Sequence, residues 1–381
     1  MDPLLLDGVK VLDLSRVLAG PFATQLLGDL GADIVKVEHA ERGDDTRHWG
    51  PPFVGGESAY FLSTNRNKRS IKADFENADD VAQIKRLAAG ADVVIENYRR
   101  GVLTRFGLDY PTLKAANPRL VYCSITSFGP GRDQALPGYD FLVQARGGVM
   151  GITGAPDGEP MKVGVAVADI VCGLYASNAV LAALYRRSRT GLGSHVEIPL
   201  FESQVSWLAN RAQDYLLSGG DTVRLGNAHP TIVPYQVFHA SDGPVALAVG
   251  NNLQFAALCR ALGREELAGD ARFATNPARV ANRTVLVPIL AQIFATRRAA
   301  DWIEDIGAAG VPCGPVNGLA GVFTDPHLAT TDLVQTVNHP TAGPVRLLAS
   351  PILVDGQRPP IRRAPPLHGQ HSDEIANRGW G

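Results

Sequence analysis

Short apolar runs rich in β-branched residues recur along the first half of the chain, and amphipathic segments separate them. The runs occupy residues 8–14, 33–38, 91–98, 119–126 and 195–201. The segments at 22–32 and 79–90 carry apolar residues at helical spacing, and each ends close to a glycine. Buried strands that alternate with helices are typical of a parallel, doubly wound sheet. We therefore predict an α/β fold for this half.

The most apolar segment, residues 170–185, predicts a buried helix that ends in arginines before Gly191. It is about one turn short of the roughly 20 residues that cross a bilayer, so we interpret it as core. Asp169 stands where this helix is expected to begin. Asp is a preferred N-cap residue, which is its plainest role. A carboxylate nucleophile, kept ionised by the helix dipole and N–H donors, is the alternative, and the pattern alone does not choose.

The helical pattern at 202–220 stops at two glycines, and we place a domain boundary there. Residues 1–220 are expected to form a large domain, completed by about 331–381. Residues 221–330 are expected to form a linker and a small domain, with a strand at 244–250 followed by helices. The proline-rich tail at 358–371 is expected to run extended along a surface.

Charge and cysteine content exclude several classes of protein. The 381 residues carry 36 basic and 38 acidic side chains, a net charge of −2, which favours neither a nucleic-acid partner nor a membrane surface. The four cysteines are far apart, so we expect no metal site, no disulfide framework and a reducing, cytoplasmic location. The first residues lack the features of a signal peptide.

Polar residues follow two of the predicted strands at the ends where ligands bind in parallel sheets. Ser15, Arg16 and Ala19 follow the first strand, and Asn97 and Tyr98 follow the third. No GxGxxG motif accompanies them, so a conventional dinucleotide site is not indicated. The segment 39–70 is expected to be a long functional loop, in which Arg66, Lys68 and Arg69 form either a solvated charge run or a phosphate contact.

Nine motifs taken in order resemble the class III CoA-transferase family. They are LDLSRVLAGPFAT, LGADIVKVE, GDDTR, NRNKRSI, VIENY, NPRLVYCSITSFG, GYD, VADIVCGLYA and APPLHGQH. Each motif is weak alone, but the ordered set is specific and covers nearly the whole chain. The resemblance implies a Rossmann-like large domain with a parallel sheet, a smaller α/β domain, and a homodimer in which two chains are threaded through each other as interlocked rings.

The resemblance also implies a chemistry. Asp169 would be the catalytic residue that accepts the acyl group, coenzyme A and its thioesters would be substrates together with carboxylic acids, and no tightly bound cofactor would be needed. The implied CoA-binding residues are Arg16, Leu18, Ala19, Asn97, Tyr98, Arg105 and Tyr139. After KVE, where the family often has an arginine that binds the CoA nucleotide, this chain has His39. We expect Arg69 or Arg42 to supply that contact if His39 does not.

Three further stretches, GDDTRHWGPPFVG, GNAHPTIVPYQVF and VGNNLQF, are most similar to a branch of the family that acts on dicarboxylic acids. Arg47 and His229 are therefore candidates to bind a distal carboxylate, for which arginine offers a bidentate fork. Gly226, Asn227 and His229 are expected where the family has a glycine-rich active-site loop. The alternatives are an ion pair of Arg47 with Asp44 or Asp45, and a loop role for His229 without a ligand.

Rival functions stay open at this point. A 2-methylacyl-CoA racemase of the same family would use a histidine in a GHD motif, whereas this chain has GYD with Tyr139. An unperturbed tyrosine titrates near pH 10, which suits α-proton exchange at neutral pH poorly. A CoA-binding protein without activity is the second rival, and a nucleotide-binding domain of another family is the third.

Overall fold

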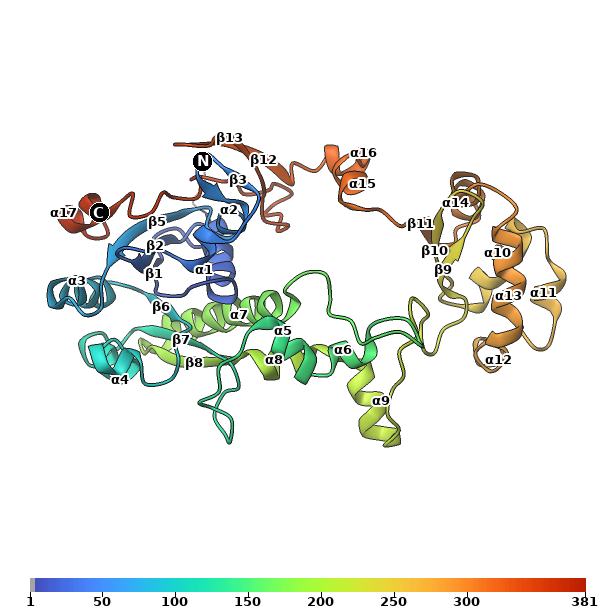
Figure 1. The fold of residues 1–381 in the computed structure, drawn as a ribbon, viewed down its shortest axis with the longest axis horizontal. Coiled ribbons are helices and arrows are strands. Elements are labelled where there is room, and N and C mark those ends of the chain that lie inside the picture. The colour runs from blue at the N-terminus through green and yellow to red at the C-terminus, as the bar shows by residue number, and fades with distance from the viewer. Residues whose placement is uncertain (1–3) are drawn as a thin grey trace. The chain divides into compact units, whose positions relative to one another are not determined.

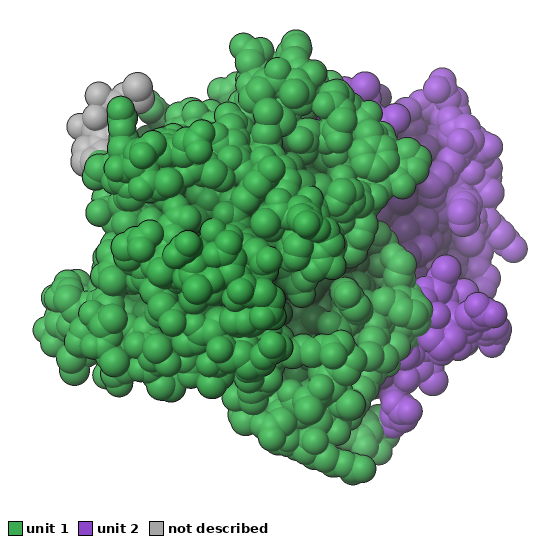
Figure 2. All heavy atoms as spheres, turned by 60° about the vertical axis from the view of Figure 1, so that its left-hand side comes forward, with its two compact units in different colours: residues 1–150, 162–220, 330–381 green, residues 151–161, 221–329 purple. Residues whose placement is uncertain are grey.

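A computed structural model of the protein describes residues 4–381, which form two compact units (Figure 2). Unit 1 comprises residues up to 150 together with 162–220 and 330–381, and unit 2 comprises 151–161 and 221–329. Domain boundaries are expected from the sequence at residue 220 and near residue 331. The units also divide at 220 and 329, and residues 151–161, which the sequence interpretation leaves in the large domain, belong to unit 2.

Six parallel strands form the main sheet of unit 1 (Figure 1). In spatial order they are β5 (Lys68–Ala73), β2 (Asp33–His39), β1 (Lys10–Asp13), β6 (Val93–Glu96), β7 (Val121–Thr126) and β8 (Ser194–Pro199). The chain winds outward from β1 in one direction and then from β6 in the other, which is the Rossmann strand order. The predicted parallel α/β sheet is confirmed, and its switch point lies between β1 and β6.

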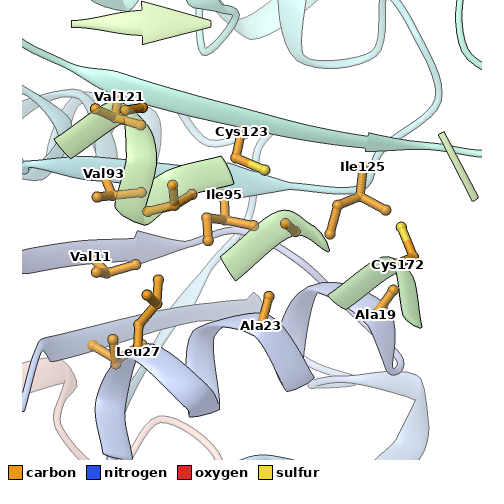
Figure 3. Close-up of a cluster of buried hydrophobic side chains, with 14 of the residues drawn as sticks. Val11, Ala19, Ala23, Leu27, Val93, Ile95, Val121, Cys123, Ile125 and Cys172 are labelled. Atoms are coloured by element: carbon orange, nitrogen blue, oxygen red, sulfur yellow. The ribbon is translucent and has the colours of Figure 1, made fainter. Parts of the chain in front are cut away.

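Apolar side chains alternate along the strands and cover both faces of this sheet. Val11, Val93 and Val121 face helices α1 (Ala19–Asp29) and α7 (Val167–Thr190), as Figure 3 shows for α1. The next residue of each strand packs into a second cluster on the opposite face. That cluster includes residues of α3 (Ala78–Ala89), α4 (Tyr110–Ala116) and α17 (Ser372–Arg378). Burial on both faces explains why these strands read as continuous apolar runs.

The polar segment 39–70 is not a long loop, contrary to the expectation. It contains η1 (Asp45–His48), β3 (Phe53–Val54), β4 (Glu57–Ser58), α2 (Ala59–Thr64) and the start of β5. The charged run within it is buried, because Arg66 pairs with Asp29, Lys68 with Asp13, and Arg69 with Asp33 and Glu374. Neither a solvated charge run nor a free phosphate contact describes this edge of the sheet.

Two predicted helices have different bounds in the structure. Helix α1 spans Ala19–Asp29 rather than 22–32, so its first residues lie directly behind the turn after β1. The single helix expected at 202–220 is two helices, α8 (Leu200–Trp207) and α9 (Asn210–Ser218). The break falls at Ala209, whose φ of +48° is incompatible with a continuous right-handed helix.

Helix α7 is longer than the apolar segment that predicts it. Its 24 residues run from Val167 to Thr190, and Gly191, with a φ of +74°, is its C-cap. By length and composition it is the one helix among residues 4–381 that could cross a membrane, which corrects the expectation that it is too short. Ala168, Cys172 and Ala176 nevertheless lie fully buried against the sheet, so we interpret α7 as a core helix.

Helices α1 and α7 approach each other closely at Gly173. A Cβ at this position would lie 2.7 Å from the backbone oxygen of Ala19, closer than real Cβ atoms come. Asp169 precedes Gly173 by four residues and therefore lies one turn away on the same face of the helix. The absence of a side chain at Gly173 thus lets α7 bring Asp169 to the start of α1.

Unit 2 has its own antiparallel sheet and apolar core. Strand β10 (Pro244–Ala248) lies between β9 (Tyr235–His239) and β11 (Cys313–Pro315). Its helices are α10 (Asn252–Ala261), α11 (Glu266–Gly269), α12 (Asn276–Ala281), α13 (Arg283–Phe294), α14 (Ala299–Ala308), α15 (Leu319–Phe323) and α16 (Pro326–Ala329). Stacking of Phe238 on Phe294, with ring centroids 4.8 Å apart, and the buried Trp302 mark the centre of this core.

The remaining elements belong to unit 1, except that α6 reaches into the first residues of unit 2. They are η2 (Leu103–Phe106), α5 (Asp140–Arg146), α6 (Val149–Ile152), β12 (Val334–His339) and β13 (Gly343–Leu348). Beyond β13 the chain runs along β5 without regular structure until α17. Asn67 bonds the backbone of residues 362 and 363, and Trp380 donates to Leu87 O.

Gly173→Ala is expected to lower the stability of the protein by about 1–3 kcal/mol, because the added methyl group meets backbone that cannot move aside. Gly307→Ala in α14 is the matched control, since nothing lies within 4 Å of its added Cβ. That variant should gain up to ~1 kcal/mol from helix propensity. Denaturant unfolding of both variants measures the difference, and equal effects would contradict the close crossing.

Candidate active site

A cavity of about 210 Å³ opens at the carboxyl ends of β1, β6 and β7. This is the switch point of the sheet, where open α/β folds bind their ligands. Its lining includes the turn after β1, the turn after β6, the end of β7, the loop before α5, the first turn of α7, and single residues of η1 and α8. The lining includes Arg16, Leu18, Ala19, Asn97, Tyr98, Tyr139 and Asp169. Seven residues singled out from the sequence therefore share one cavity.

Asp169 is not the N-cap of α7, which corrects the plainest reading of the sequence. The N-cap is Ala166, and Asp169 lies in the first turn of the helix. The backbone N–H of Ala168 donates instead to Oδ1 of Asp140, at 2.9 Å. Because Asp140 from α5 provides this cap, the carboxylate of Asp169 is left for another role.

The electrostatic surroundings of Asp169 also differ from the expectation. Burial, and then repulsion by the charge of Asp140, raise the pKa of Asp169 to about 7. The helix start does not outweigh these two effects. A carboxylate that titrates close to neutral pH is held in a destabilised charged state, which is characteristic of reactive groups.

Tyr60 is a neighbour of this carboxylate that the sequence interpretation misses. Burial, followed by the charges of Asp169, Asp140 and Asp44, raises the pKa of Tyr60 to about 12. Its ring packs edge-on against Trp49, with centroids 5.2 Å apart. Both residues come from the segment expected to be a loop, and no motif separated Tyr60 from the other aromatic residues there.

The turn between β1 and α1 presents Arg16 to the cavity. Asn97 brackets its backbone, accepting from Arg16 N at 2.9 Å and donating to Arg16 O at 2.7 Å. The guanidinium group lies over the ring of Tyr98 and 3.7 Å from Asp45. Nε of Arg16 is buried and has no hydrogen-bond partner among residues 4–381. The cavity therefore contains a cation that is only weakly neutralised.

Three of the predicted CoA contacts do not line this cavity. Arg105 is exposed, 3.5 Å from Glu76. Nδ1 of His39 accepts from the backbone N–H groups of residues 41 and 42, which closes a local turn. Arg69 is buried in its ion pairs with Asp33 and Glu374, and these two carboxylates already neutralise its guanidinium group. This favours a structural role for Arg69, and its contact with a CoA phosphate stays a prediction.

Arg47 forms a structural ion pair, as one of the two sequence interpretations expects, but its partners are Glu38 and Glu57. Its guanidinium group makes two bonds to Glu38, at 2.7 and 2.8 Å, and one to Glu57, at 2.8 Å. It also stacks on Phe61 and donates to Pro366 O. Asp44 and Asp45 are not its partners. This arrangement favours a structural role over contact with a substrate.

Gly226, Asn227 and His229 lie in unit 2. Gly226 has a φ of +59° and donates to Gly154 O at 3.0 Å. The ring of His229 packs against Tyr235, and its Nδ1 accepts from the N–H of Thr231. Within their own unit these residues form a compact turn next to β9. Their role toward a substrate stays a prediction.

The side chains near the cavity favour covalent or acid–base chemistry by a carboxylate. Among residues 4–381 no group of three or more His, Cys, Asp or Glu side chains is placed to hold a metal ion. Cys123 and Cys172 are buried thiols whose pKa burial raises, so neither is an activated nucleophile. Asp169 is the half-buried carboxylate that combines a raised pKa with a position in the cavity.

These features define an α/β protein with a carboxylate of raised pKa in a cavity at the switch point of its sheet. The family model described as CoA-transferase family III matches residues 6–372, and the chain belongs to this family. It is therefore an enzyme of the transferase class. The family predicted from the ordered motifs is confirmed.

Individual relatives agree with this assignment. Succinyl-CoA:glutarate CoA-transferase of Mus musculus is 44% identical over 97% of this chain and 85% of its own length. Succinate–glutarate CoA-transferase of Agrobacterium fabrum is 44% identical over 97% of this chain and 94% of its own. The crystal structure of a CaiB/BaiF family protein from Brucella suis matches 99% of both chains with a TM-score of 0.87 and 46% identity.

Asp169→Asn should make the folded protein more stable than the parent above pH 7. In the parent, the unfolded chain loses the proton of this carboxyl near pH 4, whereas the folded protein keeps it until about pH 7. The stability that this group contributes therefore falls as the pH rises from about 4 to 7. The thermal midpoints of the two proteins should differ most above pH 7 and converge toward pH 4. A constant difference across this range would contradict the raised pKa.

Proposed function

We propose that this enzyme transfers coenzyme A between short dicarboxylic acids through covalent intermediates on Asp169. The observation that carries the proposal is the position of Asp169, in one cavity with the Arg16 turn and with Asn97, Tyr98 and Tyr139. The two relatives described above are named for succinate and glutarate, which supports dicarboxylic acids as the substrate class.

The proposed cycle exchanges sulfur and oxygen at one carboxyl group. The carboxylate of Asp169 attacks the donor thioester, which forms a mixed anhydride and releases the CoA thiolate. The thiolate then attacks the aspartyl carbonyl, which releases the donor acid and leaves an aspartyl-CoA thioester. The acceptor carboxylate attacks that thioester, and the returning thiolate attacks the acyl carbonyl of the second anhydride. Product acyl-CoA leaves and free Asp169 is regenerated.

The raised pKa of Asp169 suits the first step of this cycle. A carboxylate is a weaker base than the thiolate that it must expel, so a more basic carboxylate narrows the gap between them. Burial and Asp140 produce that increase. The group is still ionised in about half of the molecules at a pH equal to its pKa, so it can act near neutral pH.

Arg16 is one of three arginines that line the cavity, with Arg99 and Arg100, and we propose it as the contact for an anionic substrate group. Its guanidinium is weakly paired with Asp45, at 3.7 Å, and its Nε has no protein partner among the described residues. The phosphate groups of CoA and the second carboxylate of a dicarboxylic acid are both suitable ligands. Because Arg47 is occupied by Glu38 and Glu57, we move the role of anion contact from Arg47 to Arg16.

We also propose that the enzyme works as a homodimer of interlocked chains in the cytoplasm, without a resident cofactor, a nucleic-acid partner or a membrane. The dimer rests on the family resemblance and on apolar side chains that unit 1 leaves exposed. On α7, Leu174, Tyr175 and Tyr185 are 49%, 45% and 67% exposed, and Phe141 of α5 is 60% exposed. A monomer seldom leaves so many large apolar side chains uncovered on neighbouring helices.

Asp169→Asn should reduce CoA transfer by about three orders of magnitude or more, because it removes the attacking group while keeping the shape of the side chain. Incubation of the parent with acyl-CoA and hydroxylamine should convert Asp169 to a hydroxamate, detectable by peptide mass spectrometry. Asp45→Asn is the control, since it removes another carboxylate of the same cavity and should leave the adduct at Asp169. Full transfer by Asp169→Asn would contradict the covalent role of Asp169. Exchange of the acyl α-proton for deuterium without an acceptor acid would support a racemase instead.

With succinyl-CoA as donor, glutarate should be used at least about tenfold better than valerate, as judged by kcat/KM. The two acids have the same chain length and differ in the second carboxylate. Arg16→Met should reduce this preference if Arg16 binds the distal carboxylate. If it weakens both acceptors equally, Arg16 acts on CoA instead. Equal use of the two acids by the parent would exclude dicarboxylates as the preferred class.

A further inference from the structure

The turn between β1 and α1 has a backbone conformation that its sequence does not favour. Val17 has a φ of +70°, in the left-handed region that β-branched residues avoid. Such a conformation persists only where the surroundings hold it. Val17 is flanked by Arg16 and Leu18, and all three line the cavity that contains Asp169. The strained residue therefore lies within the substrate site.

Three side chains, two from β2 and the segment after it and one from the residue after β6, hold this turn by its backbone. Nζ of Lys36, from β2, donates to Ser15 O at 2.9 Å. Asn97, just after β6, brackets the backbone of Arg16. The N–H of Val17 lies 3.3 Å from both carboxylate oxygens of Asp44, which follows β2. Backbone groups of three consecutive residues are thus fixed by side chains rather than by regular secondary structure.

Lys36 and Asp44 are also paired with each other. Their charged groups are 2.9 Å apart, and both side chains are buried, with 0% and 1% exposure. Asp44 is fixed further by the N–H and hydroxyl groups of Thr46, at 3.0 and 2.8 Å. Two further buried ion pairs surround it, Asp13 with Lys68 and Glu38 with Arg47, so the numbers of buried positive and negative charges are equal. The turn is attached to a rigid, neutral network.

A buried ion pair seldom stabilises a fold more than apolar residues of the same volume would. Its contribution is better sought in the geometry that it imposes. In the Lys36–Asp44 pair, each partner also bonds the backbone of the turn: Lys36 donates to Ser15 O, and Asp44 accepts from the N–H of Val17. Arg66 with Asp29 is a comparably buried pair, but its further bonds go to Gln25 and Asn67, away from the cavity. The geometry of the Lys36–Asp44 pair is therefore directed at the substrate site.

We propose that the buried Lys36–Asp44 pair holds the Ser15–Leu18 turn in the conformation that presents Arg16 and the start of α1 to the acyl-CoA substrate. Lys36 and Asp44 are positioning residues, because they act through the turn rather than on the substrate. This inference rests on the proposed CoA-transferase function and adds a determinant of substrate affinity to it. Loss of the pair lets Val17 relax and moves Arg16 away from its bound position.

Asp44→Asn tests this role, since asparagine keeps an oxygen acceptor and loses the charge that pairs with Lys36. The KM for acyl-CoA should rise about tenfold or more, equivalent to about 1.4 kcal/mol, while kcat at saturation changes less than about threefold. Adduct formation at Asp169 at saturating acyl-CoA should remain. A fall in kcat with an unchanged KM would overturn the proposal.

Val17→Gly separates positioning from general destabilisation, because glycine adopts a φ of +70° without strain. In a double-mutant cycle, Asp44→Asn should raise the KM less in the Val17→Gly background than in the parent. An equal increase in both backgrounds would show that the pair does not act through the strained turn. If Asp44→Asn does not fold, Lys36→Met with Asp44→Asn removes both charges together and should show the same increase in KM.

Asp92→Asn is the matched control. Asp92 also accepts a backbone N–H, from Lys10 at 2.8 Å, and pairs with Arg187 at 2.9 Å, but it lies at the opposite end of the sheet. It should lower stability without changing the KM for acyl-CoA, and an increase equal to that of Asp44→Asn would overturn the proposal. The parent enzyme is assayed in parallel: if it shows no transfer and no Asp169 adduct, the proposed function fails rather than the positioning role.

Discussion

The close crossing of α7 over α1 at Gly173 is the constraint on which the site depends. Two helices that cover the same face of a sheet normally stay apart by the thickness of their side chains. Here a glycine faces the backbone of Ala19, and Asp169 lies one turn earlier on the same helix. The carboxylate of Asp169 thereby reaches the switch point of the sheet, beside the other residues that line the cavity. Its position follows from a contact between two backbones.

Two aspartates of this unit show how the same side chain acquires opposite properties. Burial would raise the pKa of each. At Asp44 the charge of Lys36 and the hydrogen bonds from Thr46 outweigh burial and lower the pKa to about 2. At Asp169 the second influence is another carboxylate, and the pKa rises to about 7. Asp44 therefore stays charged at neutral pH and pairs with Lys36. Asp169 changes its charge close to neutral pH, which suits the role that we propose for it.

The sequence was sufficient for features that depend on local pattern. β-Branched runs predicted five of the six strands of the sheet, and the apolar segment after Asp169 predicted α7. The sixth strand, β5, was missed because its charged residues pair with Asp13 and Asp33, which are distant in the sequence. Arg47 and Arg69 are candidates for substrate contact by sequence for the same reason: their carboxylate partners are not evident from the chain pattern. An isolated arginine and a paired arginine have the same sequence signal, and only tertiary contacts distinguish them.

Asp140 illustrates the same limit within the site. It stands next to Tyr139 in the GYD motif, yet nothing in the pattern indicated that it caps α7 and acts on Asp169 through its charge. The order of the motifs did predict that one site contains Arg16, Asn97, Tyr98, Tyr139 and Asp169, and all five line the same cavity. Those residues lie at strand ends and a helix start, where position along the chain already implies position in space.

The return of the last fifty residues to unit 1 has a consequence for biosynthesis. Strand β5 lies at the edge of the sheet, and its backbone N–H groups donate to His371 and Ser372 of the C-terminal segment. During translation this edge and the surface of α3 that Trp380 contacts stay uncovered until the C-terminal segment has been synthesised. An unpaired edge strand is a template for association with other chains. Until the C-terminal segment docks, β5 is therefore an open edge at which the newly made sheet can associate with other chains.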